Sequence, residues 1–91
     1  MRNFLMLMVG EESEGDWEKY IEKLNASGKF LGGSSLGRGL SIQKEHQESQ
    51  SKITGFIRLV AEDIDQVRNL LADNPSYEAG CKIEILEELM D

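Results

Sequence analysis

The stretch from residue 52 to residue 89 decides the fold of this chain. It opens with the apolar run Ile-Thr-Gly-Phe-Ile-Arg-Leu-Val-Ala at residues 53–61. An amphipathic segment at residues 63–73 follows, then Asn-Pro-Ser-Tyr-Glu-Ala-Gly at 74–80 and an alternating run at 82–89. Apolar side chains two residues apart are typical of strands, and spacings of three and four residues are typical of helices. The stretch therefore predicts a strand, a helix that the proline ends, and a final strand.

The N-terminal part repeats this strand-then-helix order. Residues 4–9 read Phe-Leu-Met-Leu-Met-Val, and every position is apolar. Because alternate side chains of a strand point to opposite faces, this run predicts a central strand that is covered on both faces. An apolar stripe then predicts a helix over residues 14–27, with Ser13 as its N-cap, Asp16 three residues later in its first turn, and Gly28 as its C-terminal stop.

The middle of the chain gives weaker signals. Residues 29–36 predict a short strand with a bulge at its Gly-Gly pair, and the Gly-Arg-Gly at 37–39 predicts a tight turn. Residues 40–46 predict an edge or hairpin strand, and the polar residues after it predict an exposed loop. The element order is β-α-β-β-β-α-β, so we expect a single α+β domain over residues 1–91. Its sheet is expected to be ferredoxin-like, with both helices on one face.

The apolar strands also predict a partner. Two helices cover one face of such a sheet, yet the first strand carries large apolar side chains on both faces. Leaving about three of them in water would forgo some 1.5–3 kcal/mol each, and contiguous exposed apolar patches mark interfaces. We therefore expect a homodimer through the open sheet face.

Composition excludes several classes of partner. The 17 acidic and 10 basic residues give a net charge of −7, which repels nucleic acid and anionic membrane surfaces. The apolar run at residues 4–9 is shorter than the roughly 7–15 residues of a secretory signal or the 20 of a membrane span. One cysteine makes no internal disulfide, which favours a cytoplasmic location.

Four short motifs carry a family resemblance. Residues 28–36 are similar to a Gly-x-Leu-x-Gly-Gly-x-x-Leu strand, and residues 54–56 resemble a Gly-Phe strand opening. Residues 61–67 resemble an acidic turn before an apolar helix, and Asn-Pro at 74–75 followed by Gly80 resembles an Asp-Pro or His-Pro corner. In this order the motifs resemble the YCII-related domains, small α+β proteins of the dimeric α/β-barrel group. The resemblance implies a dimeric barrel in which two sheets face each other.

The departures from that family concern catalysis. Many relatives carry Asp-Gly-Pro-Phe between the third and fourth strands, where this chain has Gln-Glu-Ser-Gln-Ser at residues 47–51. Another branch places a histidine in the first helix near an acidic partner, a pair proposed for general acid/base work. Alignment on Gly28 puts Trp17 at the histidine position and Asn74 at the aspartate of the corner. Neither side chain exchanges a proton near neutral pH, so the resemblance implies that this pair is lost here.

The candidate site residues are polar or aromatic side chains near the expected cleft. They are Trp17, Tyr20, Ser34, Ser35, His46, Asn74 and Tyr77. Ser34 and Ser35 beside two glycines either offer hydroxyls and amides to a ligand or form a bulge, and Trp17 is expected as an apolar wall. His46 lies in a charged segment typical of a solvated loop. With one histidine and one cysteine, the sequence predicts no metal site and no cofactor.

Three functional hypotheses follow from these observations. The first is a non-catalytic domain that binds a small organic ligand between sheet and helices. The second is an isomerase or lyase acting on small aromatic or lactone substrates, which requires a titratable residue such as His46 or Tyr77 in the cleft. The third is a regulatory interaction module with an apolar surface beyond the dimer face.

Overall fold

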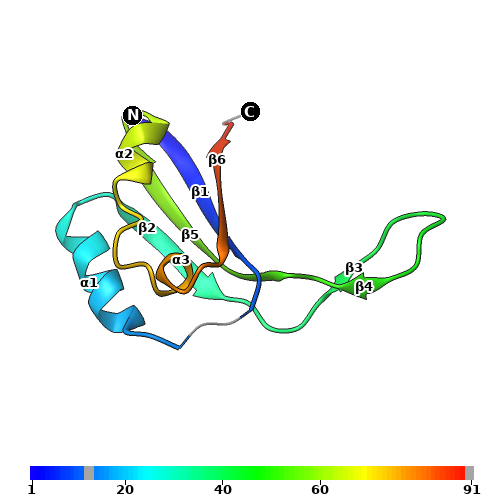
Figure 1. Cartoon of the computed structure of the whole chain (residues 1–91). Helices are drawn as coiled ribbons and strands as arrows, with labels where there is room; N and C mark the ends of the chain where they lie inside the picture. The colour runs from blue at the N-terminus through cyan, green and yellow to red at the C-terminus, as the bar shows by residue number, and fades with distance from the viewer. Residues whose placement is uncertain (12–13, 90–91) are drawn as a thin grey trace.

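A four-stranded antiparallel sheet carries one layer of short helices on one face (Figure 1). The computed structural model describes residues 1–11 and 14–89. Its elements are β1 (Arg2–Val9), α1 (Trp17–Ala26), β2 (Phe30–Ser35), β3 (Leu40–Ser41), β4 (Ser49–Gln50), β5 (Ile53–Ala61), α2 (Ile64–Arg68), α3 (Pro75–Glu78) and β6 (Lys82–Glu88). The sheet order is β2-β5-β1-β6, and β3 pairs with β4 alone. The predicted α+β, ferredoxin-like class is confirmed.

The central strand β1 has the predicted two-sided character. Phe4, Met6 and Met8 are at most 4% exposed and pack under the helices. The alternate residues Leu5 and Leu7 are half-buried and point to the other face. That second face is open in the single chain, because α1, α2 and α3 all belong to one layer (Figure 1).

Both longer helices begin where side-chain caps allow it. The Asp16 carboxylate accepts a hydrogen bond from the Lys19 amide (2.9 Å), and Asp63 accepts one from the Gln66 amide (3.0 Å). The predicted cap of α1, Ser13, lies outside the described residues, and α1 begins at Trp17 rather than at residue 14 because Asp16 is its cap. Gly28 follows α1 with a positive φ of 74°, as a C-terminal stop requires. No helix in the described ranges has the length and apolarity of a membrane span.

The proline does not end the second helix as the sequence predicted. The predicted helix over residues 63–73 is shorter, since α2 stops at Arg68, and Pro75 instead begins α3. The Asn74 side chain accepts a hydrogen bond from the Tyr77 amide (3.0 Å) and caps this third helix. Asparagine is a good N-cap and proline fits the first helical turn, because that turn's amides have no intrahelical acceptor.

Residues 37–46 also differ from the prediction. No turn forms at 37–39, and of the edge or hairpin strand expected at 40–46 the structure has the hairpin form, shortened to β3 at Leu40–Ser41 and outside the four-stranded sheet. Instead Leu40 pairs with Gln50, and the chain reverses at a turn in which the His46 amide donates to the Gln43 carbonyl (3.1 Å). These residues are mostly polar, and their large apolar side chains, Leu40 and Ile42, remain exposed and do not pack on the sheet. Residues 36–52 therefore project as a two-stranded ribbon, which we call the arm (Figure 1).

Replacing Gly33 with alanine should destabilise the sheet. A Cβ at this position would collide with the Phe56 carbonyl oxygen across the β2–β5 pair, and backbone cannot move aside cheaply. We expect the free energy of unfolding to fall by about 1–3 kcal/mol in urea titrations. Gly37→Ala is the matched control, because a Cβ there meets no atom within 4 Å. A control loss equal to that of Gly33→Ala would contradict the steric explanation.

Candidate functional site

A pocket of about 490 Å³ opens between the helices and the β2–β5 half of the sheet. Its volume lies within the roughly 300–1,000 Å³ of small-molecule sites. The lining residues are Met8, Trp17, Ile21, Phe30, Gly33, Ser34, Ser35, Thr54, Gly55, Phe56, Ile57 and Ser76. They come from β1, α1, β2, β5 and α3, so the pocket exists only when the whole domain is folded.

Two glycines leave space for the pocket where it lies against the sheet. Gly33 and Gly55 lie on the neighbouring strands β2 and β5 and have no side chain to fill the space above the sheet. A Cβ at Gly55 would lie 3.1 Å from the Met8 methyl and 3.1 Å from the Ser34 carbonyl. The strands can pair this closely because both positions are glycine.

One helix provides the apolar wall. Trp17 and Ile21 are four residues apart on α1 and therefore lie on the same face of the helix. The Trp17 ring meets the Tyr20 ring edge-on, with centroids 6.1 Å apart and an angle of 74°. This contact holds the indole at the pocket while the tyrosine enters the core.

Hydroxyl groups supply the polar part of the lining. The Ser34 hydroxyl donates to the Ser35 carbonyl (2.9 Å), and the Thr54 hydroxyl donates to the Met8 carbonyl (3.4 Å). Each oxygen keeps acceptor capacity after donating its proton. Ser35 is exposed at the pocket, whereas Ser76 is 2% exposed. The polar groups of the pocket are thus neutral hydroxyls.

The lining contains no ionisable side chain among the residues that the structure describes. General acid/base catalysis needs a titratable group within hydrogen-bond reach of the reacting atoms. The described ranges also hold no group of three His, Cys, Asp or Glu side chains suited to a metal ion. The arrangement can select a ligand by shape, apolar contact and neutral hydrogen bonds.

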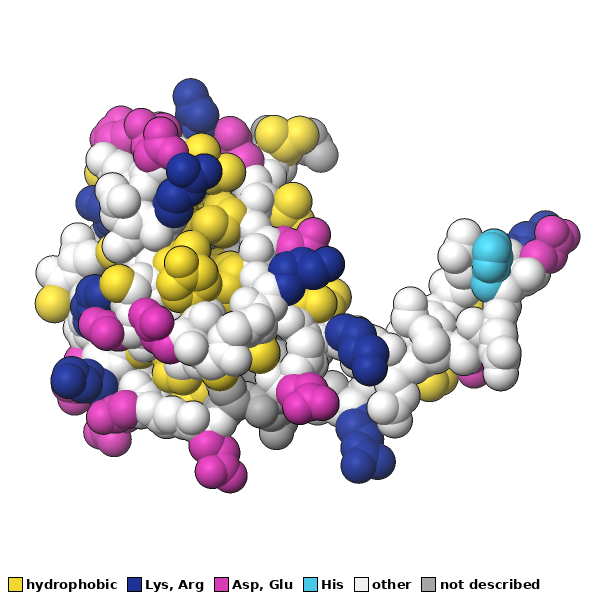
Figure 2. Space-filling model, in the orientation of Figure 1, with side chains coloured by type: hydrophobic (Ala, Val, Ile, Leu, Met, Phe, Trp, Pro, Cys, Tyr) yellow, Lys and Arg dark blue, Asp and Glu magenta, His cyan; other side chains and the backbone are white. Residues whose placement is uncertain are grey.

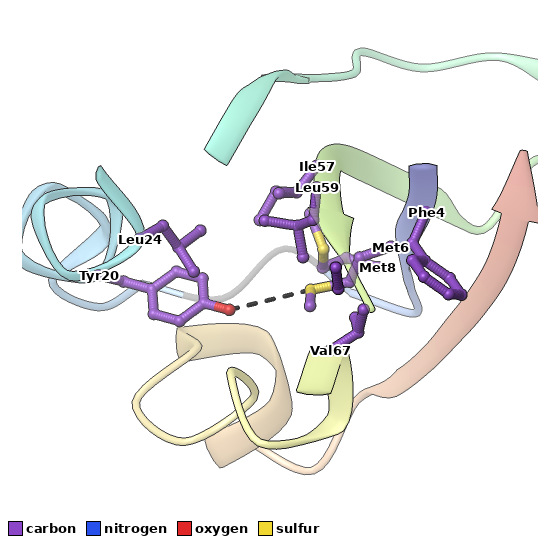
Figure 3. Packing of buried hydrophobic residues seen from close by; sticks show 9 residues of the cluster. Phe4, Met6, Met8, Tyr20, Leu24, Ile57, Leu59 and Val67 are labelled. Carbon is purple, nitrogen blue, oxygen red and sulfur yellow. Dashed lines mark hydrogen bonds between the residues drawn. The ribbon is translucent and has the colours of Figure 1, made fainter. Parts of the chain in front are cut away.

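Tyr20 and Asn74 belong to a buried cluster rather than to the pocket. The Tyr20 hydroxyl donates to the Leu70 carbonyl (2.7 Å) and also lies 3.9 Å from the Met6 sulfur (Figure 3). The Asn74 amide nitrogen donates to the same sulfur (3.6 Å). Both side chains are at most 1% exposed, so they join α1, α3 and β1 in the core.

Burial also shifts the acidity of Tyr20. Desolvation raises the pKa of its hydroxyl above the ordinary 10.0, and a hydrogen bond with Asn74 offsets part of that rise. The neutral phenol is therefore the form that the folded core stabilises. This property makes Tyr20 a structural donor at neutral pH.

The remaining candidates are spread over the molecule. Trp17, Ser34 and Ser35 line the pocket, but His46 lies exposed at the turn of the arm and Tyr77 is 47% exposed outside the lining. The sequence did not single out Ile21, Phe30, Thr54 or Ser76 as pocket residues. The sequence could have indicated Ile21, because it shares the apolar stripe of Trp17. It gave no indication of Ser76, since the prediction placed this residue in a corner after a longer helix.

The fold and the pocket define a small ferredoxin-like α+β domain with an uncharged small-molecule-sized cavity. The family model described as YCII-related domain matches residues 5–88. The chain therefore belongs to the YCII-related domain family. The comparison with curated proteins gave no match.

Replacing Tyr20 with phenylalanine should lower stability and change its pH dependence. The Leu70 carbonyl loses its donor, which should cost about 1–2 kcal/mol of unfolding free energy at pH 7. In the wild type, the stabilisation that Tyr20 contributes is fully present below its unfolded-state pKa, near 10, and is lost as the pH rises through the higher folded-state pKa. Tyr20→Phe should remove this part of the alkaline loss, measured by urea titration between about pH 9 and 11.

Tyr77→Phe is the control for that experiment. The Tyr77 ring is 47% exposed, so its hydroxyl should contribute less than about 0.5 kcal/mol at pH 7. Equal losses in the two variants would contradict the structural role of Tyr20.

Proposed function

We propose that this protein is a non-catalytic binding domain for a small, neutral, largely apolar organic molecule, held in the pocket beside Trp17. The observation that carries the proposal is the lining, which combines apolar side chains with neutral hydroxyls and has no ionisable group among the described residues. An unpaired charge buried there would lose its hydration without gaining a counter-ion. The net charge of −7 disfavours anions further.

The family resemblance implies that Trp17 and Asn74 replace an acid/base pair proposed for one branch of relatives, and this replacement supports binding over turnover. Trp17 stands at the pocket, where it adds apolar surface and moves no proton. Asn74 is 0% exposed and caps α3, so it cannot reach a ligand in the pocket. A general acid/base pair typically contributes 10²–10⁴-fold to a rate, and the described lining offers no replacement for it.

Two ligands that differ only in charge test the pocket. Trp17 is the sole tryptophan, so its emission reports directly on occupancy. We expect 2-naphthamide to change this emission in a saturable way. The isosteric 2-naphthoate should bind at least about tenfold more weakly, because its carboxylate would be buried without a partner.

A filled pocket provides the control. Ser35→Phe places a ring in the lining and should abolish the response to 2-naphthamide. Asn25→Phe adds the same ring to an exposed position of α1 outside the lining and should leave the response unchanged. Naphthoate binding as tight as the amide, or an unchanged affinity in Ser35→Phe, would refute the proposed ligand class.

The isomerase or lyase alternative gives a different result. If the protein turned over small lactones or hydroxy-aromatics, activity would have to disappear in His46→Ala or Tyr77→Phe. Both residues lie outside the described pocket lining, so we expect neither variant to matter. Robust turnover that either substitution abolishes would replace the binding proposal.

We also propose that the functional unit is a homodimer through the open sheet face. This face carries Leu5, Leu7, Phe56, Val60 and Leu86 from three adjacent strands. Leu86 is 50% exposed in the single chain. The Arg58–Glu88 ion pair (3.1 Å) lies on the same face, so each of these two charges has a counter-ion within the chain. A second copy of the sheet would cover this surface with an interface of about the standard 1,600 Å².

A charge at the centre of the open face should separate the protomers. Leu7 lies opposite Phe56 on one side and Glu84 on the other. Leu7→Glu should raise the dimer dissociation constant at least about 100-fold in sedimentation experiments, because the new carboxylate would be buried beside an acid. Ile64→Glu, at a 45% exposed position of α2, should have no such effect. A wild type that stays monomeric at about 100 µM would refute the dimer.

A further inference from the structure

The pairing of the strands directs the Ser35 side chain into the pocket. Ser35 lies opposite Gly55, which in turn lies opposite Met8. A Cβ at Gly55 would be 3.7 Å from the Ser35 Cα and 3.1 Å from the Met8 methyl. Residues opposite each other on neighbouring strands share one face of the sheet, and Met8 packs under the helices. The Ser35 side chain therefore points to the helical layer, where the pocket lies.

The other hydroxyls of the lining are less available to a ligand. The Ser34 hydroxyl donates to the Ser35 carbonyl (2.9 Å), and the Thr54 hydroxyl donates to the Met8 carbonyl (3.4 Å). Ser76 is only 2% exposed, so little of its surface can touch a bound molecule. Ser35 is exposed at the pocket. It is therefore the hydroxyl residue that a ligand can contact most directly.

Ser35 offers hydrogen-bond donors to the pocket. The Leu36 amide donates to the Thr54 carbonyl (2.9 Å), so the next pair along, Ser35 and Gly55, is of the non-hydrogen-bonded kind. The Ser35 amide and carbonyl consequently point away from β5, toward the open edge of the sheet that β2 forms. That carbonyl already accepts the Ser34 hydroxyl. The Ser35 hydroxyl and amide N–H can then donate to an acceptor atom of a ligand.

The charges near Ser35 favour a neutral acceptor. The helix α1 and the strand β2 run in opposite directions (Figure 1), so the start of α1 lies at the same end of the pocket as Ser35. Asp16 caps this helix and Glu18 lies in its first turn. Figure 2 shows acidic side chains gathered around this end of the body. They repel a carboxylate at Ser35 but not the oxygen of an uncharged carbonyl group.

The pocket is apolar in the direction away from Ser35. Ile21 lies one helical turn beyond Trp17, and Phe30 begins β2, about 16 Å from Ser35 along the strand at 3.3 Å per residue. Ile21 and Phe30 are half-buried and pack against the core. A ligand with a polar group at Ser35 therefore finds apolar contacts for the rest of its length.

We propose that the ligand is a neutral carbonyl compound, a carboxamide or a ketone, whose oxygen accepts hydrogen bonds from Ser35 and whose apolar body extends toward Ile21 and Phe30. The inference rests on the proposed binding function and names the recognised group and its orientation. Ser35 is then the residue that determines specificity for the carbonyl, while Ile21 and Phe30 contribute contact area without regard to it.

Two probes that differ in one atom pair test the carbonyl contact. The ketone 2-acetylnaphthalene and the alkene 2-isopropenylnaphthalene have nearly the same shape, but only the ketone has an acceptor. In titrations followed by Trp17 emission, Ser35→Ala should weaken ketone binding about fivefold, the effect of one lost hydrogen bond. Alkene binding should change less than about twofold. Ser35→Thr keeps the hydroxyl and should retain most of the ketone affinity.

A second set of variants tests the orientation. Ile21→Ala should weaken both probes about equally, by roughly three- to fivefold, because the naphthalene ring is common to them. Ile21→Val makes the same test with a smaller truncation and a smaller expected loss. Ser41→Ala lies on the arm, outside this lining, and should change neither probe. Circular dichroism checks that each variant keeps its fold.

The outcomes separate this inference from the binding proposal. Ketone binding that Ser35→Ala leaves unchanged, or a loss that the alkene shares, would overturn Ser35 as the carbonyl donor and leave binding in the pocket standing. Full affinity of both probes for the Ile21 variants would overturn the orientation. If neither probe nor 2-naphthamide alters the Trp17 emission of the wild type, the binding function and this inference both fail.

Discussion

The rest of the structure depends on the central position of β1, a strand that is apolar on both faces. It pairs with β5 on one side and β6 on the other, so its side chains project from the middle of both faces of the sheet. The helical layer buries Phe4, Met6 and Met8. Three short helices cannot also cover the opposite face, which leaves Leu5 and Leu7 half-buried. The same strand thus anchors the core and presents the surface on which we propose dimerisation.

The pocket depends on two glycines as much as on the side chains that line it. Gly33 and Gly55 leave the sheet bare between two paired strands, and Trp17 and Ile21 close the space from α1. Large residues at the glycines would fill the pocket or separate the strands. The polar side chains of the described lining carry hydroxyls, which fits the neutral ligand that we propose.

Trp17 and Asn74 have separate roles in this structure. Trp17 contributes to the pocket, whereas Asn74 caps α3 and contacts the Met6 sulfur in the core. Tyr20 links the two regions, because its ring touches the indole and its hydroxyl bonds the Leu70 carbonyl. Tyr20 and Asn74 are therefore part of the packing that holds the helices on the sheet.

Sequence pattern was enough to predict the strands and helices with strong periodicity, the cap at Asp63, and the antiparallel α+β class. These features depend on neighbours within a few residues, and local pattern reports such neighbours directly. Three placements became visible in the folded structure alone: Asn74 is buried, His46 lies at the tip of the arm, and Ser76 reaches the pocket. Each of these placements depends on residues distant in the chain. Two of them, those of Asn74 and Ser76, follow from the fact that Pro75 begins α3 instead of ending α2. Composition and spacing cannot encode such distances, because the packing of the sheet against its helices sets them.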